Sequence, residues 1–426
     1  MAVKPKLAMI PDGVKAGKLY SILPSDGTGD FDFSRSGSAT RINKDGLIEM
    51  VDADVPRLNY PLIDGVVSGC PSLLLENSAT NLLTYSEELS NWSNIQFVTV
   101  TDNQIISPDG TLNASKINET VDNSVHRLFL NPTVASAKHT YSVFVKKGTR
   151  SWIYLRLDGA SNEQRTWFDI ENGVIGTINS DHNASIEDYG NGWYRCAVSI
   201  KGTTYDTTPL AILAITKGND VQNYAGNVNE YIYAWGAMLE QSSFPTSYIP
   251  SLTGSQTTRS AETCNNAGDV NTFNDSEGVL MAEISALNNT VDGYTTINVG
   301  SNSVDNRLGF GFDDQSRIYG FKRTNTSWNI SIEANINEFN KVAISYDTNN
   351  NHFWLNGFKV DSNTTIGDIS QPIELDFRAS YGGEQFNGST KQLQYFDTAL
   401  TDTDLEELTS WASFNEMARD LLYTIL

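Results

Sequence analysis

Hydrophobic and polar residues alternate along much of the chain in short runs, and turn residues separate most of these runs. Alternation with a period of two residues is typical of β-strands that bury one face. Because many short strands with such turns are typical of layered sheets, we expect an antiparallel sandwich over residues 81–256. Its most regular predicted strands are 141–146, 151–157, 166–170, 193–200, 210–215 and 231–239.

A second stretch with similar alternation covers residues 269–400 and begins with the predicted strand 278–284. Within it, two alternating runs of KVAISYDTNNNHFWLNGFKV flank a polar turn at 348–351, which predicts a β-hairpin. Asn356 and Gly357 follow, and this pair suits a tight turn whose residues have positive φ. We therefore expect a second β-module after the first.

The segments before and between the two modules lack such regular patterns. Residues 1–80 are rich in Gly, Pro and Asp, which indicates turns and short strands that pack against a neighbour. Pro245 and Pro250 force extended or turn geometry, and the Ser-, Thr- and Gly-rich run that follows cannot bury enough apolar surface for a core. We therefore predict that the first module closes near Leu239 and that 257–268 is a linker.

The last segment, 401–426, is predicted to be helical. Thr403 with Glu406, and Ser413 with Glu416, have the spacing of N-terminal capping boxes. The apolar residues that fall on one helical face are Phe414, Met417, Leu421, Leu422 and Ile425. This helix packs on its own module or docks on another subunit or protein, and the pattern leaves both open. The predicted fold class is therefore all-β: two antiparallel β-sandwiches in tandem, an irregular N-terminal lead-in and a short C-terminal helical tail.

The charge balance excludes one class of partner. The chain has 29 basic and 51 acidic residues and a net charge of −22, and such a surface repels phosphate backbones. Nucleic acid is therefore not an expected partner, whereas neutral sugars and cations are compatible with this charge. We also expect no membrane insertion and no signal peptide, because the sequence has no apolar run of about 18 residues and no charged-then-apolar leader. Three cysteines favour neither a disulfide framework nor a zinc site.

Several pieces of the first 262 residues together resemble one class of protein. They are FSRSGSATRINKDGLIEMVDADVPRLNYP, CPSLLLENSATNLLTYSEELSNW, SPDGTLNASKI, DYGNGWYRC and IYAWGAMLE. As a set they resemble virion proteins of tailed bacteriophages, the tail-fibre, head-fibre and adhesin class. The resemblance implies that residues 81–256 form a jelly roll like that of carbohydrate-binding modules. The hairpin of the second module, with QLQYFDTALTDTDLEEL, resembles the laminin-G and concanavalin-like lectin sandwich, a fold that hosts lectins, hydrolases and spacers alike.

This resemblance implies a structural protein of the virion, in a tail fibre, head fibre or spike, that binds host surface polysaccharide without catalysis. Residues 1–80 or the C-terminal helix would bind other virion proteins, and fibres of this class are commonly homotrimers. The missing signal peptide fits a virion, because lysis releases particles from the host cytoplasm. Two alternatives stay open: a purely structural decoration or adaptor protein, and a capsule depolymerase. Burial of all eight tryptophans would favour the structural alternative.

Two sets of aromatic residues are candidates for glycan binding. In SWIYLRL, Trp152, Tyr154 and Arg156 share one side of the predicted strand, and in YIYAW, Tyr233 and Trp235 share a side. On an exposed face such rings would stack on sugars, and the guanidinium would bind hydroxyl or carboxylate groups. The alternative is that these rings belong to the core.

The predicted hairpin tip of the second module is a candidate loop site. Asp347, Asn349 and Asn351 offer oxygen ligands for a structural Ca²⁺, and Trp354 beside them is a further candidate for glycan binding. Asn and Asp are also the residues that an exposed turn uses, so a plain turn is the simpler interpretation. No other cofactor is expected.

Glu374 and Asp376 in IELDFRA are the candidate catalytic carboxylates, since alternation places them on one face. They resemble the Glu-x-Asp-x-x-Glu strand of concanavalin-like glycanases, but Ala379 stands where the third acid would be. Glycosidases need two carboxyl groups that flank the scissile bond. Because this strand lacks one acid of the glycanase pattern, we expect no enzyme activity.

Overall fold

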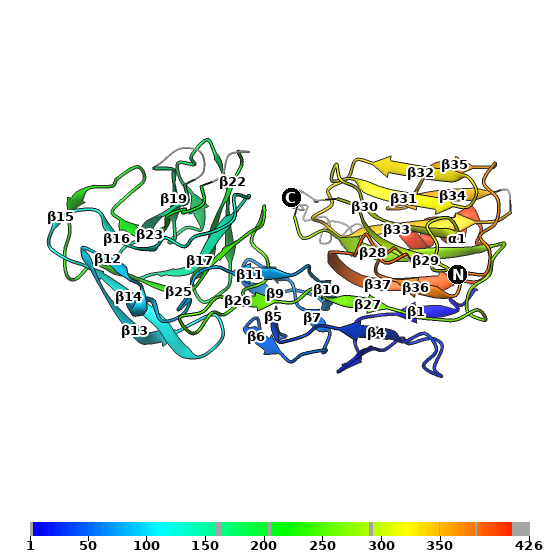
Figure 1. Cartoon of the computed structure of the whole chain (residues 1–426), viewed down its shortest axis with the longest axis horizontal. Helices are drawn as coiled ribbons and strands as arrows, with labels where there is room; N and C mark the ends of the chain where they lie inside the picture. The colour runs from blue at the N-terminus through cyan, green and yellow to red at the C-terminus, as the bar shows by residue number, and fades with distance from the viewer. Residues whose placement is uncertain are drawn as a thin grey trace.

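The computed structural model describes residues 3–158, 163–202, 206–288, 293–348, 350–379 and 381–410. Figure 1 shows two bodies built of strands, side by side along the long axis, with N-terminal strands beneath them. Within the described ranges the regular structure is almost all β, and an α-helix lies near the C-terminal end. The predicted all-β fold class is therefore confirmed. None of the described helices is long and apolar enough to cross a membrane.

Two six-stranded antiparallel sheets form the first sandwich, and all six of its most regular predicted strands are present. Across the first sheet the strands are β12 (Asn94–Gln96), β16 (His126–Leu130), β23 (Ala211–Thr216), β18 (Trp152–Arg156), β19 (Arg165–Asp169) and β20 (Val174–Ile175). Across the second they are β13 (Val98–Ile106), β14 (Leu112–Glu119), β25 (Tyr231–Glu240), β17 (Thr140–Lys147), β22 (Trp193–Ile200) and β21 (His182–Asp188). The 3₁₀ turn η1 (Leu89–Asn91) and the strand pair β15 (Asn123–Ser124) and β24 (Tyr224–Ala225) complete this body. Inward residues such as Val143, Ile153 and Leu213 meet in one apolar core.

The second sandwich packs a sheet of eight strands against a sheet of five. The larger sheet has the order β35 (Phe358–Asn363), β34 (Asn351–Leu355), β33 (Asn340–Tyr346), β28 (Gly278–Ser285), β37 (Gly388–Phe396), β10 (Ser72–Leu75) and β7 (Arg57–Asn59), with β1 (Leu7–Met9) also on β37. The smaller sheet has the order β32 (Ser327–Ile332), β31 (Ile318–Arg323), β30 (Arg307–Phe312), β29 (Thr295–Gly300) and β36 (Glu374–Asp376). The predicted hairpin is β33–β34. Asn356 and Gly357 then have φ of 51° and 86°, as the predicted tight turn requires.

The lead-in contributes strands to the second sandwich, a role that the sequence analysis missed. Strands β1 and β10 pair with β37 at successive stretches of the same strand, and β10 pairs on its other side with β7. All four residues of β10 are buried. Its run Leu73–Leu75 therefore supplies apolar side chains to both covered faces of the sheet, which an exposed segment could not do. Four strands of the lead-in and joint form a further sheet in the order β2 (Val14–Lys15), β3 (Lys18–Leu19), β4 (Phe31–Ser34) and β27 (Thr263–Asn265).

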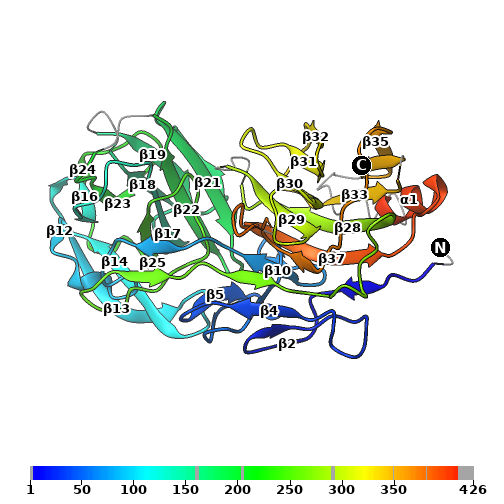
Figure 2. The same cartoon turned by 45° about the vertical axis from the view of Figure 1, so that its right-hand side comes forward.

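The same lead-in contacts the first sandwich. Figure 2 shows β4 and β5 below the two bodies. Strands β5 (Ala39–Ile42) and β6 (Ile48–Val51) form a hairpin, and β8 (Leu62–Ile63) and β9 (Val66–Val67) form another. Ile48 of the first hairpin packs with Phe144, Trp235 and Tyr248 in an apolar cluster separate from the core between the sheets. The lead-in therefore bridges both sandwiches.

The predicted linker at 257–268 is not a free connection, which corrects the sequence-based assignment. It contains β26 (Thr257–Arg259), which pairs with β11 (Ala79–Asn81), and β27, which pairs with β4. The Ser- and Thr-rich part forms no hydrophobic core of its own, but Cys264 and Ala267 near the end of the segment are buried in the core of the second sandwich. The segment is held by hydrogen bonds between its backbone and strands of the lead-in. Composition alone does not reveal these partners.

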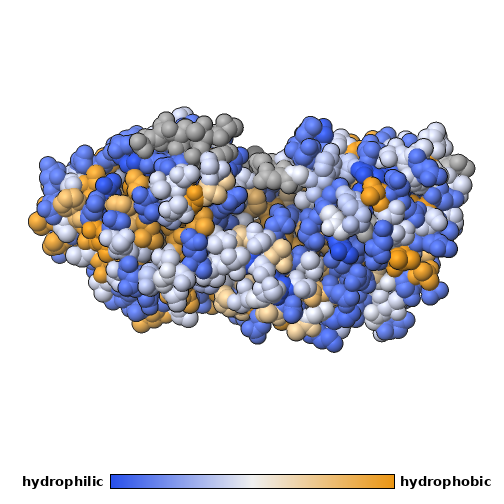
Figure 3. Space-filling model, viewed as in Figure 1, coloured by the Kyte–Doolittle hydropathy of each residue, from blue (hydrophilic) through white to orange (hydrophobic). Residues whose placement is uncertain are grey.

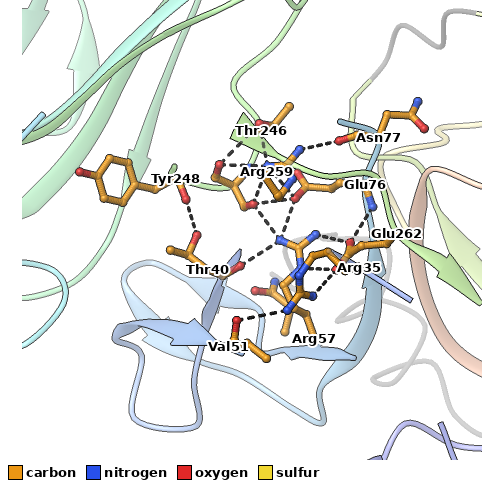
Figure 4. Close-up of polar contacts among 12 residues, drawn as sticks. Arg35, Thr40, Val51, Arg57, Glu76, Asn77, Thr246, Tyr248, Arg259 and Glu262 are labelled. Atoms are coloured by element: carbon orange, nitrogen blue, oxygen red, sulfur yellow. Dashed lines mark hydrogen bonds and ion pairs between the residues drawn. The ribbon is translucent and has the colours of Figure 1, made fainter. Parts of the chain in front are cut away.

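Five charged side chains fill the joint between the bodies (Figure 4). Arg35, Arg57, Glu76, Arg259 and Glu262 are each at most 4% exposed. Glu262 Oε1 lies 2.7 Å from Arg35 Nη1 and 2.8 Å from Arg57 Nε. Glu76 Oε2 lies 2.8 Å from Arg57 Nη1 and 3.2 Å from Arg259 Nη1. We call these five residues the joint network; they tie the lead-in to the segment that follows the first sandwich.

The described part of the predicted helical tail is α1 (Asp402–Thr409). Its N-cap is Thr401, whose Oγ1 accepts a hydrogen bond from the Asp404 backbone N–H, and not Thr403 as the capping-box spacing suggested. Leu405 and Leu408 pack on the outer face of the larger sheet, so this helix covers its own module. The capping box at Ser413 and the apolar face at 414–425 lie outside the described residues.

Candidate functional site: a cavity between the lead-in and the first sandwich

A cavity of about 500 Å³ lies where the lead-in meets the edge of the first sandwich. One wall comes from the chain around the β8–β9 hairpin and the other from strand β21, the adjoining turn and the β19–β20 turn. Its lining residues are Ile42, Asn59, Tyr60, Pro61, Leu62, Asp64, Asn172, Gly173, Ile186, Glu187, Asp188, Tyr189 and Tyr194. Binding pockets for small ligands have volumes of roughly 300 to 1,000 Å³, so this cavity is large enough for an oligosaccharide.

Two glycines set one edge of this cavity. Gly65 at the tip of the β8–β9 hairpin has φ of 71°, and Gly190 in the β21–β22 turn has φ of 76°. A Cβ on Gly190 would lie 2.5 Å from the Gly65 carbonyl oxygen, closer than real Cβ atoms approach backbone. The two backbones therefore come together only because neither residue has a side chain, and both φ values also favour glycine.

Three tyrosines, Tyr60, Tyr189 and Tyr194, supply the aromatic surface of the cavity, and each is half-buried. The ring of Tyr194 lies over Gly173, where an added Cβ would be 2.7 Å from Tyr194 Cε1. The ring of Tyr189 packs edge-on against Phe144, with ring centroids 4.8 Å apart. Packing thus fixes two of the rings while part of each remains accessible, which is the arrangement that ring stacking on a ligand needs.

The polar lining is dominated by hydrogen-bond acceptors. Asp64, Glu187 and Asp188 contribute carboxylates. Asp188 Oδ1 already accepts a hydrogen bond from the Gly190 backbone N–H, at 2.7 Å, which orients its side chain. The amide of Asn172 donates to Asp169 Oδ2 at 2.8 Å, and Asn59 Oδ1 accepts from the Ile42 backbone N–H at 2.8 Å. Sugar hydroxyl groups are donors that match this set.

A smaller cavity of about 170 Å³ adjoins the first, and the two share Ile42, Asn59, Glu187 and Tyr189. Arg195 on β22 lines it and is 4% exposed. Its Nη1 donates to the Thr246 carbonyl at 2.8 Å and its Nη2 to Ser142 Oγ at 3.1 Å. Arg195 Nε has no hydrogen-bond partner among the described residues. Glu187, on the adjacent strand β21, is the register partner of Arg195.

The first predicted glycan set lies on one face but is mostly covered. Trp152, Tyr154 and Arg156 share the outer face of their sheet, as alternation predicted, and Trp152 is half-buried. Tyr154 is 1% exposed, and Arg156 is 5% exposed and forms an ion pair with Asp158, with Nη2 and Oδ2 2.6 Å apart. Figure 3 shows hydrophobic residues gathered over β12, β16 and β23, on the same side of the first sandwich. The expectation of an open platform is therefore wrong for Tyr154 and Arg156, because neighbouring side chains on the same face, such as Trp167, bury them.

In the second predicted set Trp235 is buried, whereas Tyr233 is half-buried. Trp235 packs in the apolar cluster under the β5–β6 hairpin, 4.7 Å from the ring of Tyr248, and Tyr233 is a half-buried member at its edge. Trp354 lies beneath α1. Trp235 and Trp354 lie on outer sheet faces, but a second layer covers each face and makes the two rings part of an apolar cluster. Burial in a core is the alternative that the sequence left open for Trp235.

One residue of the predicted calcium loop, Asn351, points into the core. Asn351 is fully buried and accepts a hydrogen bond from Lys322 Nζ at 2.8 Å, so its side chain serves the core. Asp347 is exposed, and Asn349 lies outside the described residues. Within the described ranges no group of three or more His, Cys, Asp or Glu side chains could hold a metal ion. Asn351 is therefore removed from the candidate ligands.

The candidate catalytic acids lie on β36, as alternation predicted. Asp376 is fully buried and accepts hydrogen bonds from the Asn266 backbone N–H at 2.8 Å and from Arg378 Nε at 3.4 Å. Burial raises the pKa of Asp376 and also that of Glu374. The bonds of Asp376 join β36 to the segment after β27, which gives this carboxylate a structural task.

Sequence reasoning missed the cavity because its two walls come from residues 42–64 and 172–194. The signal was present in part, since DYGNGWYRC contains Asp188, Tyr189 and Tyr194. That piece contributes to the resemblance and to the predicted strand 193–200, but nothing in it indicates a cavity. Nothing in the alternation pattern indicates that the β8–β9 hairpin would lie opposite this turn.

No protein-family profile and no curated protein matches the sequence. Among solved structures, domain 4 of an arabinanase from Geobacillus stearothermophilus has 14% identity and a TM-score of 0.30, over 35% of this chain and 73% of that one. The CBM40 of the Ruminococcus gnavus IT-sialidase has 15% identity and a TM-score of 0.28, over 32% and 84%. The sialidase of Trypanosoma rangeli has 10% identity and a TM-score of 0.27, over 94% and 83%. These TM-scores are too low to carry an argument about function, which rests on the residues themselves.

Proposed function

We propose that this chain is a non-catalytic glycan-binding protein of a tailed-bacteriophage virion and that it binds saccharide in the cavity described above. One observation carries the glycan part: a ligand-sized cavity lined by three half-buried tyrosines and three carboxylates. Tyrosine rings stack on the apolar face of a sugar ring, while carboxylates accept hydrogen bonds from its hydroxyl groups. Both kinds of contact converge in one place here.

The virion part is supported by the resemblance of the first 262 residues to phage fibre and adhesin proteins. A single saccharide contact is weak, so useful attachment would come from many copies on one particle. The joint network suits this role, because its buried ion pairs tie the lead-in to the segment between the two bodies and so favour a stiff projecting unit.

Removal of the stacking rings tests the glycan part. A saccharide found on a glycan array should bind Tyr60→Ala and Tyr194→Ala proteins about tenfold or more weakly than the unaltered protein in isothermal titration calorimetry. Tyr294→Ala is the matched control, because Tyr294 is 40% exposed in the second sandwich and far from the cavity lining. Equal affinity for all four proteins would place the site elsewhere.

Labelling of particles tests the virion part. Gold-conjugated antibody against this chain should decorate intact phage particles from the lysate in electron micrographs, at a fibre, a spike or the head. Antibody found only with soluble lysate protein would contradict a virion protein. Absence of new reducing ends when the protein is incubated with host capsule would support binding without catalysis, and their release would show a depolymerase.

A purely structural adaptor is the second candidate, and tryptophan burial favours it. Of the seven tryptophans within the described ranges, six are at most 6% exposed: Trp92, Trp167, Trp193, Trp235, Trp328 and Trp354. Trp152 is half-buried. A folded, multivalent protein that gives no signal on a broad glycan array would favour this adaptor over the glycan-binding function.

A further inference from the structure

We infer that the cavity between the lead-in and the first sandwich selects neutral or amine-bearing saccharide units and rejects units that carry a carboxylate. This inference rests on the proposed glycan-binding function and specifies its ligand class. It follows from the charge and the hydrogen-bonding capacity of the lining.

The lining is acidic. Asp64, Glu187 and Asp188 bring three carboxyl groups, and no Lys, Arg or His occurs among the described residues that line the larger cavity. Like charges repel more strongly near a protein surface than in bulk water, because the effective dielectric constant there is lower. A uronic or sialic acid would bring a further negative charge among these three, inside a molecule whose net charge is already −22.

Among its described residues the lining also has no cationic donor for a carboxylate, and charge-assisted hydrogen bonds are the strong ones. The Asn172 amide already donates to Asp169, and the Asp64, Glu187 and Asp188 side chains only accept when ionised. The neutral side-chain donors of the lining are the amide groups of Asn59 and Asn172 and the hydroxyl groups of Tyr60, Tyr189 and Tyr194. Hydroxyl and ammonium groups, by contrast, donate to carboxylates, and an ammonium gains further from the faces of tyrosine rings.

Arg195 does not reverse this preference. Its guanidinium lines the adjoining smaller cavity, not the larger one, and it lies across β21 and β22 from Glu187. Glu187 lines both cavities, whereas Arg195 lines only the smaller one, so the charge of Arg195 is not part of the surface that a ligand in the larger cavity contacts.

The test uses three labelled trisaccharides: N-acetylated chitotriose, which is neutral, its de-N-acetylated form, which carries amines, and trigalacturonate, which carries carboxylates. In fluorescence titrations of the full chain, the neutral or the amine-bearing probe should bind at least about tenfold more tightly than trigalacturonate. Tighter binding of trigalacturonate would overturn the inference and leave glycan binding intact. Failure of all three probes, and of a broad glycan array, would instead refute the proposed function and the inference with it.

Charge reversal locates the effect. Asp64→Lys should bind the amine-bearing probe more weakly and trigalacturonate more tightly than the unaltered protein. Asp64→Asn should reduce the difference in affinity between these probes while disturbing the fold less. Asp305→Lys is the matched control, because Asp305 is exposed in the second sandwich. This substitution changes the net charge by the same amount as Asp64→Lys. An identical change in selectivity for Asp305→Lys would mean that the overall charge, and not the cavity, selects the ligand.

Discussion

Glu76 shows how the joint network controls a single ionisation. Burial would raise the pKa of this carboxyl group, but the charges of Arg259 and Arg57 outweigh burial and lower its pKa to about 2. Ser247 adds two hydrogen bonds, from its backbone N–H at 2.9 Å and from its hydroxyl at 2.6 Å. A carboxyl group whose pKa is lower in the folded than in the unfolded chain stabilises the fold above its unfolded pKa of about 4.5. That stabilisation is lost as the pH falls from about 4.5 to about 2.

Replacement of Glu76 should therefore have a pH-dependent cost. Glu76→Gln should lower the free energy of unfolding by about 3 kcal/mol at pH 7, because it leaves buried guanidinium groups without their partner. The difference from the unaltered protein should shrink as the pH falls towards 2, where Glu76 itself becomes protonated. Urea unfolding at pH 7, 4 and 2.5 measures this difference, with Asp305→Asn as an exposed control. A difference that stays constant over this pH range would contradict the assigned role of the charge.

At the scale of elements, alternation predicted the strands but not their partners. The six predicted strands of the first sandwich and the hairpin of the second are present because each buries one face, and that property is local. Pairing of β1 with β37 joins residues more than 380 positions apart, such as Leu7 and Tyr395, so no local pattern reveals it. The same holds for Trp235 and Trp354. Alternation placed Tyr233 and Trp235 on one side of their strand, but it could not show that a hairpin covers Trp235 or that a helix covers Trp354.

The central position of β10 predicts slow hydrogen exchange. Leu73 and Leu74 pair with β37 on one side and with β7 on the other, so their amides are enclosed within a sheet. We expect their exchange to be as slow as that of β28, close to the rate set by global unfolding. Exchange mass spectrometry of the full chain measures both segments. Exchange of 72–75 within minutes would mean that the lead-in is only loosely attached.

Because the β8–β9 hairpin contacts the β21–β22 turn, we expect a substitution at this contact to weaken saccharide binding as well as fold stability. A matched substitution elsewhere should reduce stability alone. Gly190→Ala adds a Cβ 2.5 Å from the Gly65 carbonyl and should displace the hairpin that forms one cavity wall. Gly17→Ala is a matched control, because Gly17 has φ of 79° and nothing lies within 4 Å of an added Cβ. Both should lose about 1 kcal/mol of unfolding free energy from the positive φ, measured by urea unfolding. Only Gly190→Ala should also bind saccharide more weakly, and equal binding would mean that the contact does not shape the site.

At the scale of the whole molecule, two apolar cores remain distinct and a polar joint connects them. The core of each sandwich forms its own cluster, and the joint network fills the space that the Ser- and Thr-rich segment leaves without apolar side chains. The sequence therefore predicted two bodies correctly. It could not predict the cavity, because the walls come from the lead-in and the first sandwich, and only the folded lead-in brings them together.

A crystal structure with bound saccharide tests the central claim most directly. Crystals of the full chain soaked with the strongest ligand from a glycan array should show the sugar between the β8–β9 hairpin and the β21–β22 turn. A sugar ring should then stack on Tyr60 or Tyr194, with its hydroxyl groups within hydrogen-bond distance of Asp64 or Asp188. Density for the sugar on the outer face of β18 or on the second sandwich, with this cavity filled only by water, would contradict the account.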